Sequence, residues 1–266
     1  MADHALAIAQ FAPGPDTAAN LATMTELATR AAERGATLVA FPEYSAYFTA
    51  SMGADWVAAA EDLDGRFVTA LAELAERLGI HLVAGMLESA EPGRFSNTVV
   101  AIDNLGVVQA IYRKLHLFDA FGQRESDWVV PGPIGAPETF AWGSFTVGLQ
   151  TCYDLRFPEV TRRLVDAGAD LVLCPSEWVR GPLKEHHWRT LVTARAIENT
   201  IYVAAPDHAP PIGAGNSMIV DPTGVEVATI GEATDVAIAW LASDRVSVTR
   251  ATNPSLANRR FRVASP

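Results

Sequence analysis

Apolar residues in the first part of the chain gather in short continuous runs that alternate with a helical repeat. Residues 5–11 and 37–41 are apolar runs of the length typical of buried strands. Between them, apolar residues recur at helical spacing, with Asp16 as the predicted N-cap and Gly35 as the predicted end of the helix. The pattern predicts a strand, a helix and a second strand.

A second helix and three further strands complete this half of the chain. The helix is predicted to begin after Asp64, which suits an N-cap, and to end at Gly79. The predicted strands cover residues 80–87, 96–103 and 107–114.

The second half of the chain repeats this order of elements. A strand at residues 145–150 precedes a helix that begins near Pro158 and ends near Gly168. The run at residues 170–178 mirrors the run at residues 37–45. The remaining predicted elements are a helix at residues 184–199 and strands at residues 201–207, at residues 215–221 and after Gly224. The chain is therefore expected to be duplicated in architecture.

Two strand-rich halves, each with one helical face, predict an α/β protein whose two sheets pack face to face with helices outside. This is a four-layer α-β-β-α sandwich. No low-complexity linker divides the chain, so residues 1–266 are expected to form a single domain. Residues 251–266 contain arginines and prolines without a clear period, which predicts a C-terminal tail available for a subunit contact.

Composition narrows the function classes. With 266 residues and 49% hydrophobic residues, the chain can bury a large core, and its net charge of -11 disfavours nucleic acid and anionic lipid as partners. The first residues lack a basic segment, and no apolar run reaches the roughly 18 residues that a membrane-spanning helix needs. Only two cysteines occur, Cys152 and Cys174, which favours a reducing cytoplasm over a disulfide framework.

Three reactive side chains each follow an apolar, strand-like run. Glu43 lies in FPEYS, Lys114 in YRKLHLF and Cys152 in TCYDLRFPE. Reactive groups in α/β proteins gather at strand ends, so the three are expected to meet. A thiol, a carboxylate and an ammonium together supply a nucleophile, its base and an anion stabiliser, which suits acyl transfer.

These three blocks, in this order, resemble the nitrilase superfamily of carbon–nitrogen hydrolases over nearly the whole chain. The resemblance implies the four-layer sandwich and a cofactor-free amidase that attacks non-peptide amide bonds. It assigns the nucleophile to Cys152, the general base to Glu43 and the oxyanion stabiliser to Lys114. It also matches Glu125, which precedes a Pro-Gly pair, to a second glutamate that supports catalysis.

The cysteine block looks most like the branch that contains omega-amidase and deaminated glutathione amidase. Carbamoyl-amino-acid hydrolases tend to carry two arginines after this block, whereas only Arg156 occurs here. The loop at residues 120–124 is shorter than in the deaminated glutathione enzymes. The expected substrate is therefore a small amide that bears a carboxylate. A carbamoyl-amino-acid hydrolase and a non-catalytic nitrilase-like binding protein are the alternatives.

Three residues near the nucleophile have two readings each. The backbone N–H of Tyr153 is placed to share the oxyanion with Lys114, although its ring suits a core position equally well. Arg156 either binds a substrate carboxylate or braces the turn by pairing with Asp154 or Glu159. Trp178 either lines the pocket or packs in the core.

Each member of the triad also has a purely structural reading. Cys152 could be an inert buried thiol, as Cys174 is expected to be, and Glu43 and Lys114 could be solvated surface charges. Cys152 is instead expected to be thiolate-prone beside Lys114. The histidines lack zinc-ligand spacing, so no metal site is predicted. Family members commonly form dimers, so the resemblance implies a homodimer or a higher homo-oligomer.

Overall fold

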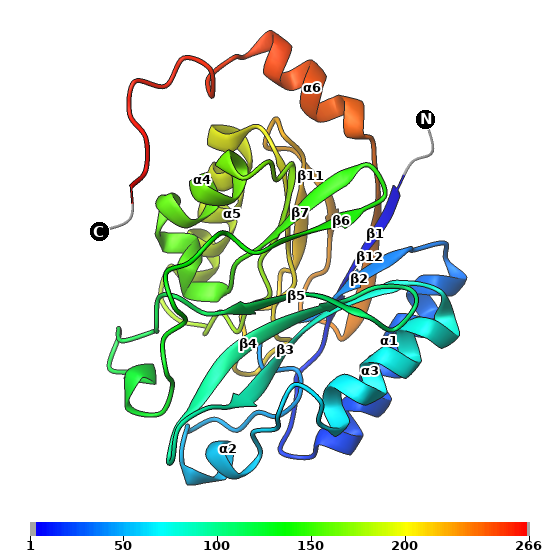
Figure 1. The fold of residues 1–266 in the computed structure, drawn as a ribbon, viewed down its shortest axis with the longest axis vertical. Helices are drawn as coiled ribbons and strands as arrows, with labels where there is room; N and C mark the ends of the chain where they lie inside the picture. Colours follow the sequence, from blue (N-terminus) through cyan, green and yellow to red (C-terminus); the bar gives the residue numbers. More distant parts are fainter. Residues whose placement is uncertain (1–3, 265–266) are drawn as a thin grey trace.

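The strands of the first half form one mixed sheet in the computed structural model, which describes residues 4–264 (Figure 1). Its strands are β1 (His4–Gln10), β2 (Leu38–Ala40), β3 (His81–Ser89), β4 (Phe95–Ile102), β5 (Val108–Arg113) and β12 (Asp235–Leu241). The strand order is β12-β1-β2-β3-β4-β5. Strands β1, β2 and β3 are parallel, and β12, β4 and β5 pair antiparallel at the two sides.

The second sheet repeats this pairing pattern. Its strands are β6 (Thr139–Trp142), β7 (Phe145–Leu149), β8 (Leu171–Leu173), β9 (Tyr202–Ala205), β10 (Met218–Val220) and β11 (Glu226–Thr229). They lie in the order β11-β10-β9-β8-β7-β6, with β7, β8 and β9 parallel and the other pairs antiparallel. The predicted duplication is confirmed, with one exchange: β12 follows the second half in sequence but pairs with β1 of the first sheet.

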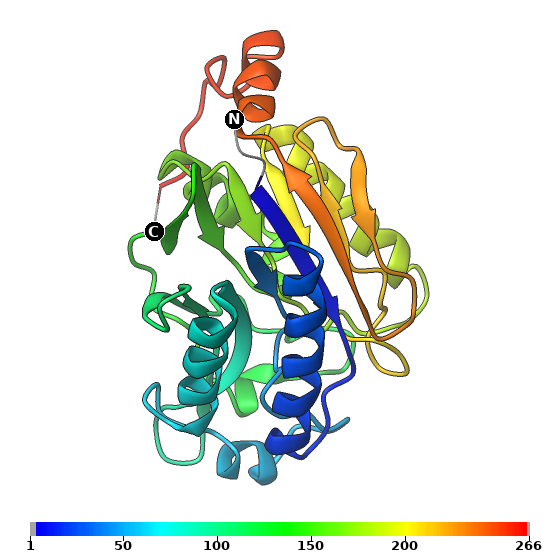
Figure 2. The ribbon, with the colours of Figure 1, turned by 90° about the vertical axis from the view of Figure 1, so that its right-hand side faces the viewer.

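Helices cover the outer face of each sheet, so the four-layer α-β-β-α sandwich is confirmed (Figures 1 and 2). Helices α1 (Thr17–Glu33) and α3 (Arg66–Leu78) pack on the first sheet, and α4 (Pro158–Asp166) and α5 (Lys184–Asn199) pack on the second. The shorter elements are α2 (Ala54–Ala58), α6 (Ser243–Thr252) and the 3-10 helices η1 (Glu125–Asp127) and η2 (Cys152–Arg156).

Apolar side chains of both sheets meet in a central core. Leu6, Val83 and Val99 of the first sheet and Phe145 and Leu171 of the second belong to one buried cluster. Separate clusters fill the space between each sheet and its helices. Burial of this kind contributes about 25 cal/mol for each Å² of apolar surface removed from water. It fixes the two sheets, and with them the loops at their strand ends.

The predicted N-cap residues of two helices can be compared with those in the structure. Asp16 caps α1 as predicted, accepting hydrogen bonds from Ala18 N at 2.9 Å and Ala19 N at 3.2 Å. The predicted cap at Asp64 is wrong, because the N-cap of α3 is Gly65, which has no side chain. A residue earlier in the chain accepts the hydrogen bond from the first turn instead. The oxygen Oε2 of Glu61 accepts from Phe67 N at 2.8 Å.

The C-terminal segment begins slightly later than predicted. Helix α6 extends to Thr252, so the predicted boundary at residue 251 falls inside a helix, and residues 253–264 contain no helix or strand. Arg259 fixes this segment to α4 by pairing with Asp166. None of the helices within residues 4–264 combines the length and the apolar character that a membrane crossing requires.

Candidate active site

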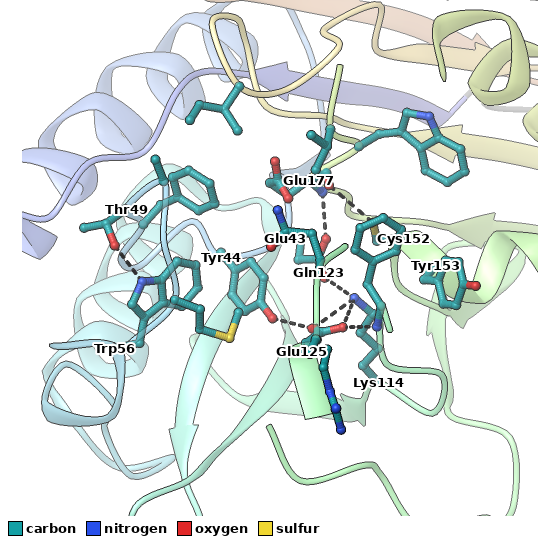
Figure 3. A pocket seen from close by; sticks show the side chains of 18 of the residues that line it. Glu43, Tyr44, Thr49, Trp56, Lys114, Gln123, Glu125, Cys152, Tyr153 and Glu177 are labelled. Carbon is teal, nitrogen blue, oxygen red and sulfur yellow. Dashed lines mark hydrogen bonds and ion pairs between the residues drawn. The ribbon is translucent and has the colours of Figure 1, made fainter. Parts of the chain in front are cut away.

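One pocket collects the strand-end residues of both sheets (Figure 3). It has an empty volume of about 820 Å³, including open solvent at its mouth. Glu43 follows β2, Lys114 follows β5, and Cys152 and Glu177 follow β7 and β8. The pocket wall includes Glu43, Tyr44, Phe48, Trp56, Lys114, Phe118, Gln123, Glu125, Cys152, Tyr153, Glu177, Trp178 and Lys184. The structure thus brings the three predicted reactive side chains together.

Cys152 lies at a sharp turn from strand to helix. Strand β7 ends at Leu149, and Cys152 begins η2 with a φ of 45°, in the left-handed region that a residue with a Cβ seldom adopts. Its N–H donates to Pro175 O at 3.1 Å, and its Sγ lies 3.5 Å from Glu177 O. The side chain is 6% exposed and faces the pocket. Such a strained turn holds a nucleophile in a fixed direction.

Glu43 and Lys114 form a buried ion pair beside the thiol. The Lys114 Nζ lies 2.9 Å from Glu43 Oε1, and the two side chains are 2% and 1% exposed. Asn97 of β4 donates to the same Glu43 oxygen at 2.6 Å. The reading of these residues as solvated surface charges is wrong.

Glu125 belongs to the same buried cluster. One of its oxygens lies 2.9 Å from Lys114 Nζ, and another accepts from Tyr44 Oη at 2.5 Å. The N–H of Phe118 also donates to it. Although Glu125 follows a charged loop, it is only 6% exposed, so it is not a solvated loop carboxylate. Lys114 is therefore held between two carboxylates.

The two carboxylates beside Lys114 differ in proton affinity. Burial raises the pKa of Glu43 above its usual value, and Lys114 only partly opposes this. The pKa of Glu125 is lowered, because Lys114 and the hydrogen bonds from Tyr44 and Phe118 outweigh the effect of burial. Burial favours the neutral amine of Lys114, but Glu125 and Glu43 together raise its pKa well above the usual value. The arrangement favours Glu43 as the proton acceptor and Glu125 as a permanent anion.

The two cysteines are both free, and their surroundings differ. Burial and the nearby Glu43 raise the pKa of the Cys152 thiol well above its usual value, which favours the thiol over the expected thiolate. Lys114 lowers this pKa but does not prevail. Cys174 is fully buried, and burial raises its pKa to about 12. A thiol whose pKa is raised in this way needs a neighbouring base to become a nucleophile.

Glu177 is a site residue that the sequence reading did not identify. Its backbone N–H donates to Glu43 Oε2 at 2.7 Å. Its own Oε1 is buried without a hydrogen-bond partner among residues 4–264. Burial, reinforced by Glu43, raises the pKa of the Glu177 carboxyl well above its usual value. This side chain lines the pocket, and its raised pKa favours the protonated form. Its only signal in the sequence is the match between CPSEW and FPEYS.

Asp154 joins the lysine block to the cysteine block. Its carboxylate accepts hydrogen bonds from Tyr112 Oη at 2.6 Å and from Thr151 N at 3.1 Å. His116 approaches the same carboxylate through its N–H at 3.0 Å and its Nδ1 at 2.7 Å. Asp154 is fully buried, so these contacts fix the distance between the two blocks.

Gly85 lets strand β3 approach the base closely. A Cβ at this position would lie 2.6 Å from Tyr44 N and 2.7 Å from Glu43 Cα. Such distances are too short for any side chain, so the position of the base depends on a residue without one.

The remaining predicted site residues lie near the nucleophile in different settings. The Tyr153 ring packs edge-on against Phe118 and Phe157, with centroids 5.1 and 5.3 Å away. Its N–H as an oxyanion donor stays a prediction. Trp178 is 2% exposed and lines the pocket while packing against Trp188, so both of its readings apply.

Arg156 does not brace the turn. No carboxylate within residues 4–264 pairs with it, so the expected partners Asp154 and Glu159 are not used. Its guanidinium lies 4.7 Å from the centroid of Trp178, and its Nε and Nη2 are buried without hydrogen-bond partners in the described part of the chain.

Comparison with known proteins gives matches over almost the whole chain. The family described as carbon–nitrogen hydrolase matches residues 5–251. A deaminated glutathione amidase from Escherichia coli O157:H7 is 38% identical over 257 residues, which are 96% of this chain and 97% of the relative.

Solved structures agree with the sequence matches. The NitFhit protein of C. elegans superposes with a TM-score of 0.88 and 31% identity, over 98% of this chain and 66% of that one. An amidase variant from Nesterenkonia sp. AN1 superposes with a TM-score of 0.81 and 28% identity, over 97% of this chain and 94% of that one. In that amidase, the acetamide moiety of fluoroacetamide is covalently added to the active site cysteine.

Proposed function

The chain belongs to the carbon–nitrogen hydrolase family, and we propose that it hydrolyses a small, carboxylate-bearing amide through a thioester on Cys152. It is an amide-hydrolysing enzyme with a cysteine nucleophile. The substrate's carboxylate and the roles of individual residues are the proposed part. The observation that carries them is the Glu43–Lys114 ion pair, buried in the same pocket as the Cys152 thiol.

The first half-reaction forms the thioester. Glu43 takes the proton of the Cys152 thiol as the sulfur attacks the amide carbon. The carbonyl oxygen becomes an oxyanion, which Lys114 and the Tyr153 N–H stabilise. The carbon–nitrogen bond then breaks, and the protonated Glu43 gives its proton to the departing ammonia. The raised pKa values of Glu43 and Cys152 support this transfer, because neither group is locked in its charged form.

The second half-reaction consumes water. Glu43 removes a proton from water, and the resulting hydroxide attacks the thioester carbon. The carbon–sulfur bond breaks, the thiolate recovers the proton from Glu43, and the carboxylic acid leaves. Glu125 keeps Lys114 in place throughout, since its lowered pKa makes it a stable anion. The order of events is ping-pong, with ammonia released before the acid.

The proposed carboxylate on the substrate is supported by the unpaired Arg156. A guanidinium without a protein partner suits a carboxylate ligand. Relatives include deaminated glutathione amidases, whose name identifies their own substrate. The short loop at residues 120–124 is the reason to propose a smaller carboxylated ω-amide for this chain.

Ammonia release tests the proposal directly. The panel contains monoamides of dicarboxylic acids, their uncharged analogues, N-carbamoyl amino acids and nitriles, with intact-mass detection of a thioester. Fast release from the monoamides with an acyl adduct on Cys152 is expected. A preference for carbamoyl compounds would select the carbamoyl hydrolase alternative. The absence of both ammonia and adduct across the panel would select the non-catalytic one.

We also propose that the protein acts as a homodimer or a higher homo-oligomer in a reducing compartment such as the cytoplasm. Ile197 on α5 is 45% exposed and Leu183, which precedes α5, is 67% exposed, so an apolar side chain lies at the surface near each end of this helix. Both thiols are free, as a thiol enzyme requires. Size-exclusion chromatography with light scattering would give a monomer mass if the oligomer proposal is wrong.

A further inference from the structure

Lys184 is a buried cation at the start of a helix. A lysine at such a position is ordinarily solvated, yet Lys184 is only 7% exposed and lines the pocket that contains Cys152. Three aromatic rings surround its ammonium. The Nζ lies 4.9 Å from the centroid of Phe118, 4.7 Å from that of Phe121 and 4.9 Å from that of Trp178. These distances are within the range of cation–π attraction.

No acidic side chain in the described part of the chain pairs directly with this ammonium, although Glu177 and Asp207 lie near enough to favour its charge. Among residues 4–264, no carboxylate forms an ion pair or a hydrogen bond with the Lys184 Nζ, whose close neighbours are the three rings. By contrast, Arg180, in the loop just before α5, pairs with Glu232 at 2.7 Å. Glu177 lies near enough to interact with this charge, but it forms no hydrogen bond or ion pair with the ammonium, and its Oε1 has no partner within the described residues.

The energetics of this arrangement favour an external anion. An ammonium that is partly removed from water loses hydration energy, and cation–π contacts worth about 2 kcal/mol offset only part of that loss. Burial lowers the pKa of Lys184, which is the same cost expressed as proton affinity. An anion that enters the pocket would restore the missing charge pairing.

Arg156 adds a second unpaired cation next to the first. Its guanidinium lies 4.7 Å from the Trp178 centroid and 5.9 Å from the Phe121 centroid, so the two cations share two rings. Arg156 is not among the described residues that line the pocket, whereas Lys184 is. A ligand in the pocket therefore meets Lys184 first, with Arg156 beyond the Trp178 ring.

We propose that Lys184 is a specificity-determining residue, and that its caged ammonium binds the substrate's carboxylate while the amide lies at Cys152. The proposal rests on the amidase function proposed above. In this proposal Lys184, and not Arg156, makes the primary contact with the carboxylate. Arg156 supports it as a second positive charge on the other side of the rings that the two cations share. The selected substrates are short ω-amides, because both ends must fit in one pocket.

The test is a ratio of specificities. For wild type, kcat/KM is measured on glutaramate, the monoamide of a five-carbon dicarboxylic acid, and on pentanamide, which lacks the carboxylate. Wild type is expected to prefer glutaramate. In Lys184→Met the ratio is expected to fall about 10- to 100-fold, because a charge-assisted hydrogen bond is lost. The loss should lie mainly in the KM for glutaramate.

Matched variants separate this role from a structural one. Lys184→Arg keeps the charge and is expected to recover most of the preference for glutaramate. Arg180→Met removes a paired surface cation from the same loop and should leave the ratio unchanged. Arg156→Ala is expected to lower the ratio less than Lys184→Met does. If Lys184→Met does not fold, as judged by its thermal melt, Lys184→Gln is measured in its place.

Several results would overturn the proposal. A Lys184→Met variant that keeps the wild-type ratio, or an Arg156→Ala variant that alone loses it, would return the role to Arg156. A wild type that hydrolyses both amides equally would remove the carboxylate subsite. The proposed function fails separately, and visibly, if wild type releases ammonia from neither amide.

Discussion

The backbone N–H of Glu177 donates a 2.7 Å hydrogen bond to Glu43 Oε2. These two residues follow β2 and β8, which occupy equivalent places in the two sheets. The carbonyl of Glu177 also lies 3.5 Å from Cys152 Sγ. One peptide segment of the second sheet thus contacts both the base and the nucleophile. The duplicated architecture places a carboxylate after one strand and the backbone groups that orient it after the equivalent strand.

Cys152 should react with iodoacetamide before Cys174, and its modification should abolish turnover in step. Cys152 lines the pocket, whereas Cys174 is fully buried with a pKa raised to about 12. Peptide mapping after limited alkylation measures the order. A Cys174→Ala variant is the control and should lose activity at the wild-type rate. Labelling of Cys174 first, with loss of activity, would contradict the assignment.

Glu43→Gln should lower kcat by about 100- to 10,000-fold, because the amide cannot accept the thiol proton. The substitution also turns an NH₂ group toward one of the donors on Glu43, which are Lys114, Asn97 and the Glu177 N–H, so the variant should be less stable and kcat is compared where the thermal melt shows it folded. Glu125→Gln is the matched comparison, since it removes the other carboxylate beside Lys114. It should lower turnover while the thiol still reacts with iodoacetamide at the wild-type rate. Equal loss of thiol reactivity in both variants would mean that the two share the base role.

Lys114→Ala should cost about 3 kcal/mol of transition-state stabilisation, because it removes a charged donor from a dry site. The loss should appear in kcat. Arg113, the cation next to Lys114 in sequence, is the control. It pairs with Glu88 at 2.5 Å and is not part of the pocket wall. Arg113→Met should leave kcat close to that of wild type. Near-normal turnover in a folded Lys114→Ala protein would show that the oxyanion is stabilised by other groups.

Asp154→Asn should lower the free energy of unfolding by about 3 kcal/mol. The buried side chain loses its negative charge, and its new NH₂ group points at hydrogen-bond donors. The donors are Thr151 N, His116 N and the Tyr112 hydroxyl. Denaturant unfolding measures the change. Asp166→Asn, at a partly exposed ion pair, is the control and should cost about 1 kcal/mol or less. Equal stabilities for the two variants would refute the bridging role.

His208 should make the protein less stable as the pH falls below neutrality. The ring is buried, its Nε2 lies 2.6 Å from Glu43 O, and burial lowers its pKa from 6.5 to about 4. The unfolded chain therefore binds the proton more tightly. The neutral ring contributes its full stability above pH 6.5, and this contribution, up to about 3 kcal/mol, is lost as the pH falls toward 4.

His208→Gln keeps a donor but removes the titration. Its free energy of unfolding should change less than that of wild type between pH 7 and pH 5, and taking the difference cancels the other titrating groups. His186→Gln, at an exposed position, should follow the wild-type curve. Parallel curves for wild type and His208→Gln would show that the ring does not control acid stability.

Local patterns were enough to predict the fold, because buried strands and amphipathic helices carry their own period. The Asp16 cap is an interaction over two or three residues, and it was confirmed. The Asp64 cap failed because Glu61, six residues before Phe67, provides the hydrogen bond instead. The short strand β6 and helix α2 were missed, since each is too short to show a clear period.

The sequence predicted only those site residues that carry a signal in their own short segment of the chain. Glu43, Lys114 and Cys152 each carry a local signal, a charged or nucleophilic group after an apolar run. Lys184 and Asn97 carry none. Lys184 looks like an ordinary first residue of a helix, and the approach of Phe118, Phe121 and Trp178 makes it a buried cation. Such residues gain their role from contacts between distant segments, which periodicity does not report.

The strand exchange of β12 has a consequence for how the enzyme could be divided. Glu43 and Lys114 belong to the first sheet and Cys152 to the second, so neither half holds a complete set of reactive groups. The first sheet also takes its edge strand, Asp235–Leu241, from the far end of the chain. Two fragments cut between β5 and β6 would each be inert. Recovery of amidase activity on mixing them would report, in one colorimetric signal, that the fragments had docked and that the β1–β12 ladder had formed between separate polypeptides.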